Sequence, residues 1–255
     1  MQNSFWRMAI VAKVLVMFAG ISIAQGALAQ AVCGGTSADA VDRVEKAPFS
    51  AKRRITTITR KSDGTSRRNE ATASEARDGN GRRYRAGERR WTTLIGNERV
   101  PQSEILVRIS DPIDNTDTEW SSGSKEVRVI HWPRGTGRSG TEERSPDPFL
   151  GTPTQDSNVQ KLGTKTIEGV LVEGVRTSYA VPHAQAKGDN QIIVVHECWY
   201  SPDFKVVILE TDDDPRSSNF TNQLENIVRG EPDVAKYQPP ADYVRQNIEI
   251  PAPTP

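Results

Sequence analysis

Apolar and polar residues alternate along short stretches of this chain, which is the pattern of half-buried β-strands. Residues 51–60 are rich in isoleucine and threonine, and residues 126–132 alternate as Glu-Val-Arg-Val-Ile-His-Trp. Residues 191–200 begin with a run that is apolar at both parities, so we expect that strand to be covered on both faces. Together these stretches predict a mainly β protein.

Turn-forming residues separate the predicted strands. Asp63-Gly64 and the glycine-rich segment 78–81 predict hairpin turns, because these residues tolerate the positive φ angles of tight turns. Residues 220–228 fit either a strand or a short helix, and residues 233–237 fit a single helical turn. The pattern therefore predicts little helix beyond the N-terminal segment.

The first 29 residues have the order of a secretory signal peptide. A basic start, Arg7 and Lys13, precedes an apolar run at 14–24, and Ala27-Leu28-Ala29 offers small residues for cleavage. The apolar run is shorter than the roughly 20 residues of a membrane-spanning helix, and no later run approaches that length. We expect a cleaved signal at 1–29, a periplasmic or secreted mature protein, and no membrane-spanning helix after cleavage.

Composition divides the rest of the chain into segments. Residues 30–47 are small and polar and predict a linker, and residues 248–255 predict a disordered tail. Residues 48–247 are interpreted as a single β-rich domain. A stretch at 134–158, dense in glycine, proline, serine and charge, predicts a flexible loop within it. That stretch could also be a domain boundary, but neither half alone has a rich core, which favours an insertion.

Charge is balanced overall but unevenly distributed. The formal net charge is +0, yet residues 51–90 hold 13 Lys/Arg and 5 Asp/Glu, whereas residues 91–255 hold 16 and 25. The interpretation that we favour is a solvated sheet face whose arginines pair with acids elsewhere. The alternative is a basic face that orients the protein toward an anionic surface or partner. Nucleic acid is not expected as a partner, because the protein is exported and the basic residues lack an aromatic-spaced binding signature.

The two cysteines are Cys33, just after the cleavage point, and Cys198, within an apolar strand. An even count in an exported protein predicts a disulfide between them. In the alternatives, Cys198 is a small buried residue and Cys33 is exposed, paired between chains or lipidated.

Few residues of the sequence suggest catalysis or metal binding. In a strand, His196 and Cys198 share one face and Glu197 lies on the other, but no metal-ligand spacing accompanies them. The apolar neighbours of Cys198 predict burial rather than a reactive thiol. Residues 212–214 are acidic but lack the later ligands of a calcium loop, so they predict an acidic turn. We expect no metal, no cofactor and no enzymatic activity.

Four tryptophans stand near the ends of predicted strands: Trp91, Trp120, Trp132 and Trp199. They could line an apolar cleft, or they could cap a thin core.

The second half of the chain carries a series of motifs. Residues 197–203 read Glu-Cys-Trp-Tyr-Ser-Pro-Asp, and Asp-Pro-Arg follows at 214–216, Glu-Pro-Asp at 231–233 and Pro-Ala-Asp-Tyr at 240–243. This order resembles that of a group of uncharacterised exported bacterial proteins, over residues 160–245. The group has no assigned catalytic residues. More distantly, the layout resembles periplasmic lipoprotein-carrier folds, which implies a curved antiparallel sheet whose concave side holds an acyl chain or a partner.

Residues and resemblance together predict a mainly β fold, with one curved antiparallel sheet or half-barrel and little helix after the signal peptide. The expected function is an exported, non-catalytic binding module for an unknown ligand that is lipid-like or acyl. The rival hypothesis is an envelope interaction or structural protein that binds a partner through the basic face or an edge strand.

Overall fold

The computed structural model describes residues 46–61, 63–133, 157–181, 191–216 and 218–252. The predicted signal peptide, most of the predicted linker and nearly all of the predicted loop at 134–158 lie outside these residues.

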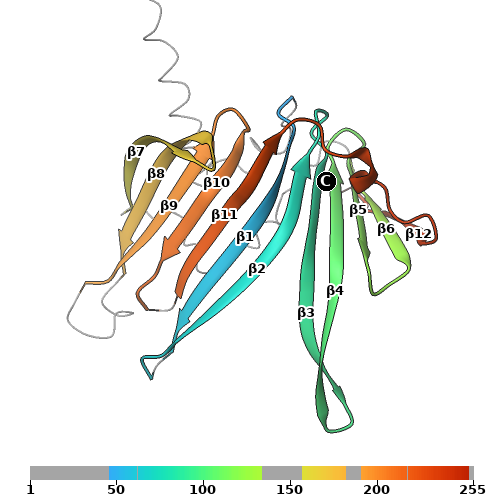
Figure 1. Ribbon diagram of the computed structural model, residues 1–255, viewed down its shortest axis with the longest axis horizontal. Helices are drawn as coiled ribbons and strands as arrows, with labels where there is room; N and C mark the ends of the chain where they lie inside the picture. The colour runs from blue at the N-terminus through green and yellow to red at the C-terminus, as the bar shows by residue number, and fades with distance from the viewer. Residues whose placement is uncertain (1–45, 62, 134–156, 182–190, 217, 253–255) are drawn as a thin grey trace, which may run out of the picture.

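All described strands join one sheet of 12 strands, in the order β12-β6-β5-β4-β3-β2-β1-β11-β10-β9-β8-β7 (Figure 1). The strands are β1 (Phe49–Arg60), β2 (Ser66–Arg77), β3 (Arg83–Ile95), β4 (Glu98–Asp111), β5 (Thr116–Ser121), β6 (Glu126–His131), β7 (Asn158–Ile167), β8 (Val170–Ala180), β9 (Ile193–Ser201), β10 (Val206–Asp213), β11 (Ser218–Arg229) and β12 (Val244–Glu249). The sheet is curved and open, with β12 and β7 at its edges, which confirms the predicted fold class. One pair departs from the antiparallel expectation, because β12 runs parallel to β6.

The hairpin turns and the short helix after β11 form where the local sequence predicts them. Gly64, between β1 and β2, has φ +82°, and Gly81, between β2 and β3, has φ +86°. The ambiguous segment 220–228 lies within strand β11. The predicted helical turn is the 3-10 helix η2 (Val234–Tyr237), where Asp233 Oδ1 accepts a hydrogen bond from Ala235 N at 2.9 Å. Strand β12 was not predicted, and it extends into the residues assigned to the tail.

A β-bulge interrupts the pairing of β11 with β1. Ser50 pairs with Val228, but Lys52 pairs with Glu225, so β11 carries an extra residue at this point. Asn226 lies within the bulge and has φ +53°. Asparagine tolerates this left-handed conformation better than most residues with a side chain, and the sequence therefore permits the bulge here.

Replacing Asn226 by valine is expected to lower the free energy of unfolding by about 1–2 kcal/mol, because a β-branched residue is strained at positive φ. Asn226→Gly is the matched control and should stay within about 0.5 kcal/mol of the wild type. Urea denaturation followed by circular dichroism measures both variants. Equal stabilities for the valine and glycine variants would contradict the assigned strain.

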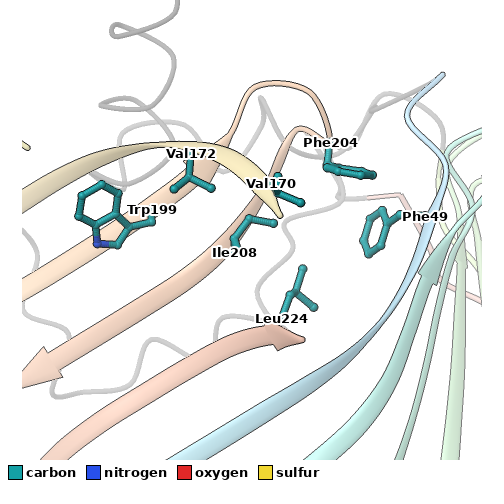
Figure 2. Packing of buried hydrophobic residues seen from close by; sticks show 7 residues of the cluster. All are labelled: Phe49, Val170, Val172, Trp199, Phe204, Ile208 and Leu224. Atoms are coloured by element: carbon teal, nitrogen blue, oxygen red, sulfur yellow. The ribbon is translucent and has the colours of Figure 1, made fainter. Parts of the chain in front are cut away.

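The main apolar core lies over the half of the sheet that contains β1 and β8 to β11 (Figure 2). Its buried members are Phe49, Val170, Val172, Trp199, Phe204, Ile208 and Leu224. The rings of Phe49 and Phe204 meet edge to face, with centroids 6.0 Å apart. A smaller cluster joins Val175, Cys198 and Tyr200. These contacts anchor β1 to the C-terminal strands.

Arginines of the basic stretch 51–90 pair with carboxylates on neighbouring strands. Arg53 Nε lies 2.6 Å from Glu75 Oε2, and Arg54 Nε lies 2.7 Å from Glu225 Oε1. Further pairs in this stretch are Arg68–Glu70, Arg82–Asp78, Arg89–Glu104 and Arg90–Glu88. Two of these pairs, Arg54–Glu225 and Arg89–Glu104, use acids outside the stretch, so the favoured interpretation of arginines matched by acids elsewhere holds in part.

Candidate functional site on one face of the sheet

The strand register aligns side chains from six neighbouring strands in two rows on one face of the sheet, which we call the pocket face. From β1 to β6, the first row is Lys52, Ser74, Ala86, Val107, Trp120 and Val127. The second row is Ser50, Ala76, Tyr84, Ile109, Thr118 and Val129. Directly paired residues of antiparallel strands project from the same face, so each row is continuous. Both rows begin with polar residues and become largely apolar from β3 onward.

The alternation of the sequence places these apolar residues together. On β6, Val127 and Val129 alternate with charged Glu126 and Arg128. On β4, Val107 and Ile109 flank Arg108, which lies on the other face and pairs with Glu119 there at 3.0 Å. The apolar members of β4 and β6 are buried, with 1% of Val127 and 9% of Val107 exposed. One face of this half of the sheet is therefore apolar and the opposite face is charged.

The helix η2 lies beside the second row. The ring of Tyr237 meets the ring of Tyr84 edge to face at 6.1 Å, and Lys236 Nζ lies 5.8 Å from the centroid of Tyr84. The guanidinium of Arg82 lies over the ring of Tyr237 at 4.8 Å. Burial raises the pKa of Tyr237 above its ordinary value, so its hydroxyl keeps its proton and donates to Arg82 O at 3.4 Å. These contacts fix η2, and with it Lys236, against the sheet.

A pocket of about 420 Å³ opens where the two rows begin. It is lined by Ser50, Ala51, Lys52, Ser74, Asn226 and Lys236. Within the described parts of the chain, neither lysine lies within 4 Å of a carboxylate oxygen. The pocket therefore combines two ammonium groups with hydroxyl and amide donors. We call it the basic pocket.

The acidic residue opposite Lys52 is matched by another cation. Glu225 pairs with Lys52 in the strand register, but its carboxylate accepts two hydrogen bonds from Arg54, at 2.7 and 3.0 Å. These hydrogen bonds lower the pKa of Glu225, and the charge of Lys52 adds a smaller effect in the same direction. Arg54 thus neutralises Glu225 and leaves the charge of Lys52 available to the pocket.

The four tryptophans singled out in the sequence lie in different surroundings. Trp120 belongs to the first row of the pocket face. Trp91, on β3, is 40% exposed beneath the guanidinium of Arg89. Trp132 follows β6 and donates from Nε1 to Asp117 Oδ2 at 2.8 Å, and Trp199 is buried in the main core. The structure thus places one of the four within the candidate site.

The segment around Cys198 has the predicted arrangement. Cys198 pairs with Glu210 and His196 with Asp212, so the cysteine and the histidine share a face. His196 Nδ1 lies 2.8 Å from Asp212 Oδ1, and Cys198 is 2% exposed, which confirms its predicted burial. Cys33 lies outside the described residues, so its disulfide with Cys198 stays a prediction.

The described residues show neither a metal-binding group of side chains nor a membrane-spanning helix. Those residues contain no group of three or more His, Cys, Asp or Glu side chains that could hold a metal ion. Among the same residues, no helix is long and apolar enough to cross a membrane.

The basic pocket was not predicted from the sequence. Lys52 and Lys236 lie far apart along the chain and belong to no recognised motif. The local signals were the asparagine within an otherwise strand-like run and the short helical turn, but neither indicates a pocket by itself.

No family model matches the chain, and no curated protein matches it. Several solved structures are similar. LprF from Mycobacterium bovis is 12% identical, with a TM-score of 0.34, over 83% of this chain and 95% of that chain. A LolA superfamily protein from Nitrosomonas europaea is 9% identical, with a TM-score of 0.31, over 83% and 97%. A putative outer membrane lipoprotein-sorting protein domain from Vibrio parahaemolyticus is 9% identical, with a TM-score of 0.22, over 82% and 93%. Because these identities and TM-scores are low, the function is argued from the residues of this chain alone.

Proposed function

We propose that this protein is an exported, non-catalytic binding module for a ligand with an acyl or lipid-like chain, which lies along the pocket face over β3 to β6. The observation that carries the proposal is the pair of largely apolar rows from four consecutive strands on one face of a single-layered sheet. The chain itself already buries Val107, Ile109, Val127 and Val129. The ligand would therefore contact the partly exposed members of the rows, Tyr84, Ala86 and Trp120. A flexible hydrocarbon chain suits a long, narrow apolar strip and gains roughly 25 cal/mol for each Å² removed from water.

The rival hypothesis, a partner bound through the basic face, has less support. Several arginines of residues 51–90 form ion pairs with carboxylates of the same sheet. Each such pair weakens the field that an anionic partner could recognise.

Ala86→Phe tests this proposal. Ala86 lies in the first row between Ser74 and Val107, and its small side chain is partly exposed. A phenyl group there should occupy the path of the chain and weaken palmitate binding at least about tenfold, which corresponds to ~1.4 kcal/mol. Native mass spectrometry and a fluorescent fatty-acid displacement assay measure the loss. Circular dichroism checks that the variant is folded.

The matched control is Ala71→Phe, on the opposite face of β2 at an exposed position. This variant should bind palmitate as the wild type does. The proposal fails if the wild-type protein neither retains nor takes up an acyl ligand, or if both phenylalanine variants bind equally well.

A further inference from the structure

We propose that the basic pocket is a binding site for a phosphoryl group, and that the acyl-chain ligand of the pocket face carries this group at its polar end. The inference rests on the proposed function and names the class of its ligand, an anionic amphiphile. The donor set supports it: two lysine ammonium groups, the hydroxyls of Ser50 and Ser74, and the amide of Asn226. Ammonium and hydroxyl groups donate to the oxygens of a phosphoryl group, and hydrogen bonds to an ionised oxygen are the strong ones.

Three separate parts of the chain build the pocket. Lys52 projects from β1, and Lys236 comes from η2, which is fixed by the packing of Tyr237 on Tyr84. Asn226 lines the pocket from the bulge of β11, where the extra residue alters the strand register. The two lysines therefore come from different elements that meet at one hollow, and do not simply follow each other along an exposed strand.

Three carboxylates lie near the pocket, and each accepts a hydrogen bond. Glu225 is neutralised by the two hydrogen bonds from Arg54. Glu168 lies at the rim, where its Oε2 accepts a hydrogen bond from Asn226 N at 3.2 Å. Glu231 is turned toward the β2–β3 turn and accepts from Gly79 N at 3.0 and 3.1 Å. Arg54 thus balances Glu225, and the charges of the two lysines remain beside those of Glu168 and Glu231.

The basic pocket leads directly into the apolar rows. Lys52 is the first residue of the row that continues through Ser74 and Ala86 to Val107. Adjacent strands are ~4.8 Å apart, so Val107 lies about 14 Å from Lys52 along the row. A phosphoryl group held between the lysines would direct an attached hydrocarbon chain toward Ala86 and Trp120, the partly exposed apolar members of this row, past the buried Val107. The pocket face thus has a charged end and an apolar length, as an anionic single-chain lipid requires.

The experiment compares three probes on the full chain: palmitoyl lysophosphatidylglycerol, monopalmitoylglycerol and inorganic phosphate. The two lipids share the palmitoylglycerol part and differ in the phosphoglycerol headgroup of the first, which carries the phosphoryl group. We expect the phosphorylated lipid to bind at least about tenfold more tightly in calorimetry, because charge-assisted hydrogen bonds add to the apolar contact. The double variant Lys52→Gln/Lys236→Gln should lose this preference and keep its affinity for monopalmitoylglycerol. Lys161→Gln, at an exposed position of edge strand β7, is the matched control and should keep the preference.

The outcomes separate this inference from the proposed function. Equal affinity for the two lipids, or an unchanged preference in the double variant, would overturn the phosphoryl site and leave the acyl ligand standing. Lysine-dependent binding of inorganic phosphate without lipid binding would support the site, with free phosphate as its source, and overturn the acyl proposal. Failure of all three probes would overturn both. Thermal unfolding of each variant confirms that the measured differences come from folded protein.

Discussion

Replacing Arg77 by methionine is expected to lower the free energy of unfolding by about 3 kcal/mol, because a buried guanidinium joins three segments of the chain. Arg77 is 3% exposed, and its guanidinium donates to the carbonyl oxygens of Ala47, Phe204 and Lys205. The group also lies 5.1 Å from the centroid of Phe49. Burial lowers the pKa of Arg77 to about 10, so it stays charged at neutral pH. Methionine fills much of the same space but leaves the carbonyls without their donor.

Urea denaturation of Arg77→Met, Arg77→Lys and Arg67→Met tests this result. A lysine presents a compact ammonium and cannot reach all three carbonyls, so it should recover less than half of the loss. Arg67, on the same strand, is exposed, and its replacement should change stability by less than about 0.5 kcal/mol. If Arg77→Met were as stable as Arg67→Met, the central role of this guanidinium would be wrong.

Gly174→Ala should lower the free energy of unfolding by about 2–3 kcal/mol, because the ring of Trp199 occupies the space that a side chain at residue 174 would need. A Cβ atom on Gly174 would lie 2.5 Å from Cζ3 of Trp199 and 2.6 Å from two other ring atoms. The indole is held in place, with Lys165 Nζ 3.5 Å from its ring centroid and the core cluster around it. The ring cannot move aside without disturbing the core.

The matched control is Gly87→Ala, in strand β3. A Cβ atom there would meet Ala73 Cβ at 3.4 Å, an ordinary contact, so this variant should keep or slightly raise the stability. Chemical denaturation followed by tryptophan fluorescence measures both. Adding Trp199→Leu to Gly174→Ala should make the alanine nearly neutral relative to Trp199→Leu alone. If Gly174→Ala lowered the free energy of unfolding as much in the Trp199→Leu variant as in the wild type, the assigned clash with the indole ring would be wrong.

Local patterns predicted most strands and turns, because they depend on neighbours in the sequence. The alternation within residues 126–132 and the Asp63-Gly64 turn are examples, and the structure has a strand and a turn at these positions. Strand β12 was missed because its order comes from parallel pairing with β6, more than a hundred residues earlier in the chain. Strand β7 gives little sequence signal, because most of its residues are exposed at an edge of the sheet and lack apolar alternation.

The candidate site could not be predicted from the sequence for a related reason. The alternation of valines and isoleucines on β4 and β6 was visible, but only the strand register shows that they continue the row that starts at Lys52. The bulge at Asn226 is likewise a property of two paired strands. The face assignments of His196 and Cys198 were correct because they need only the two-residue period of a single strand.

The pairing of β1 with β11 has a consequence for how the protein folds. It joins the first strand of the described chain to the eleventh, and the ion pair of Arg54 with Glu225 spans 171 residues. Phe49 meets the ring of Phe204 only when the chain as far as Phe204 is available. Folding rates fall as contacting residues lie farther apart in the sequence. The central part of the sheet should therefore form late and slowly, after the local hairpins on either side of it.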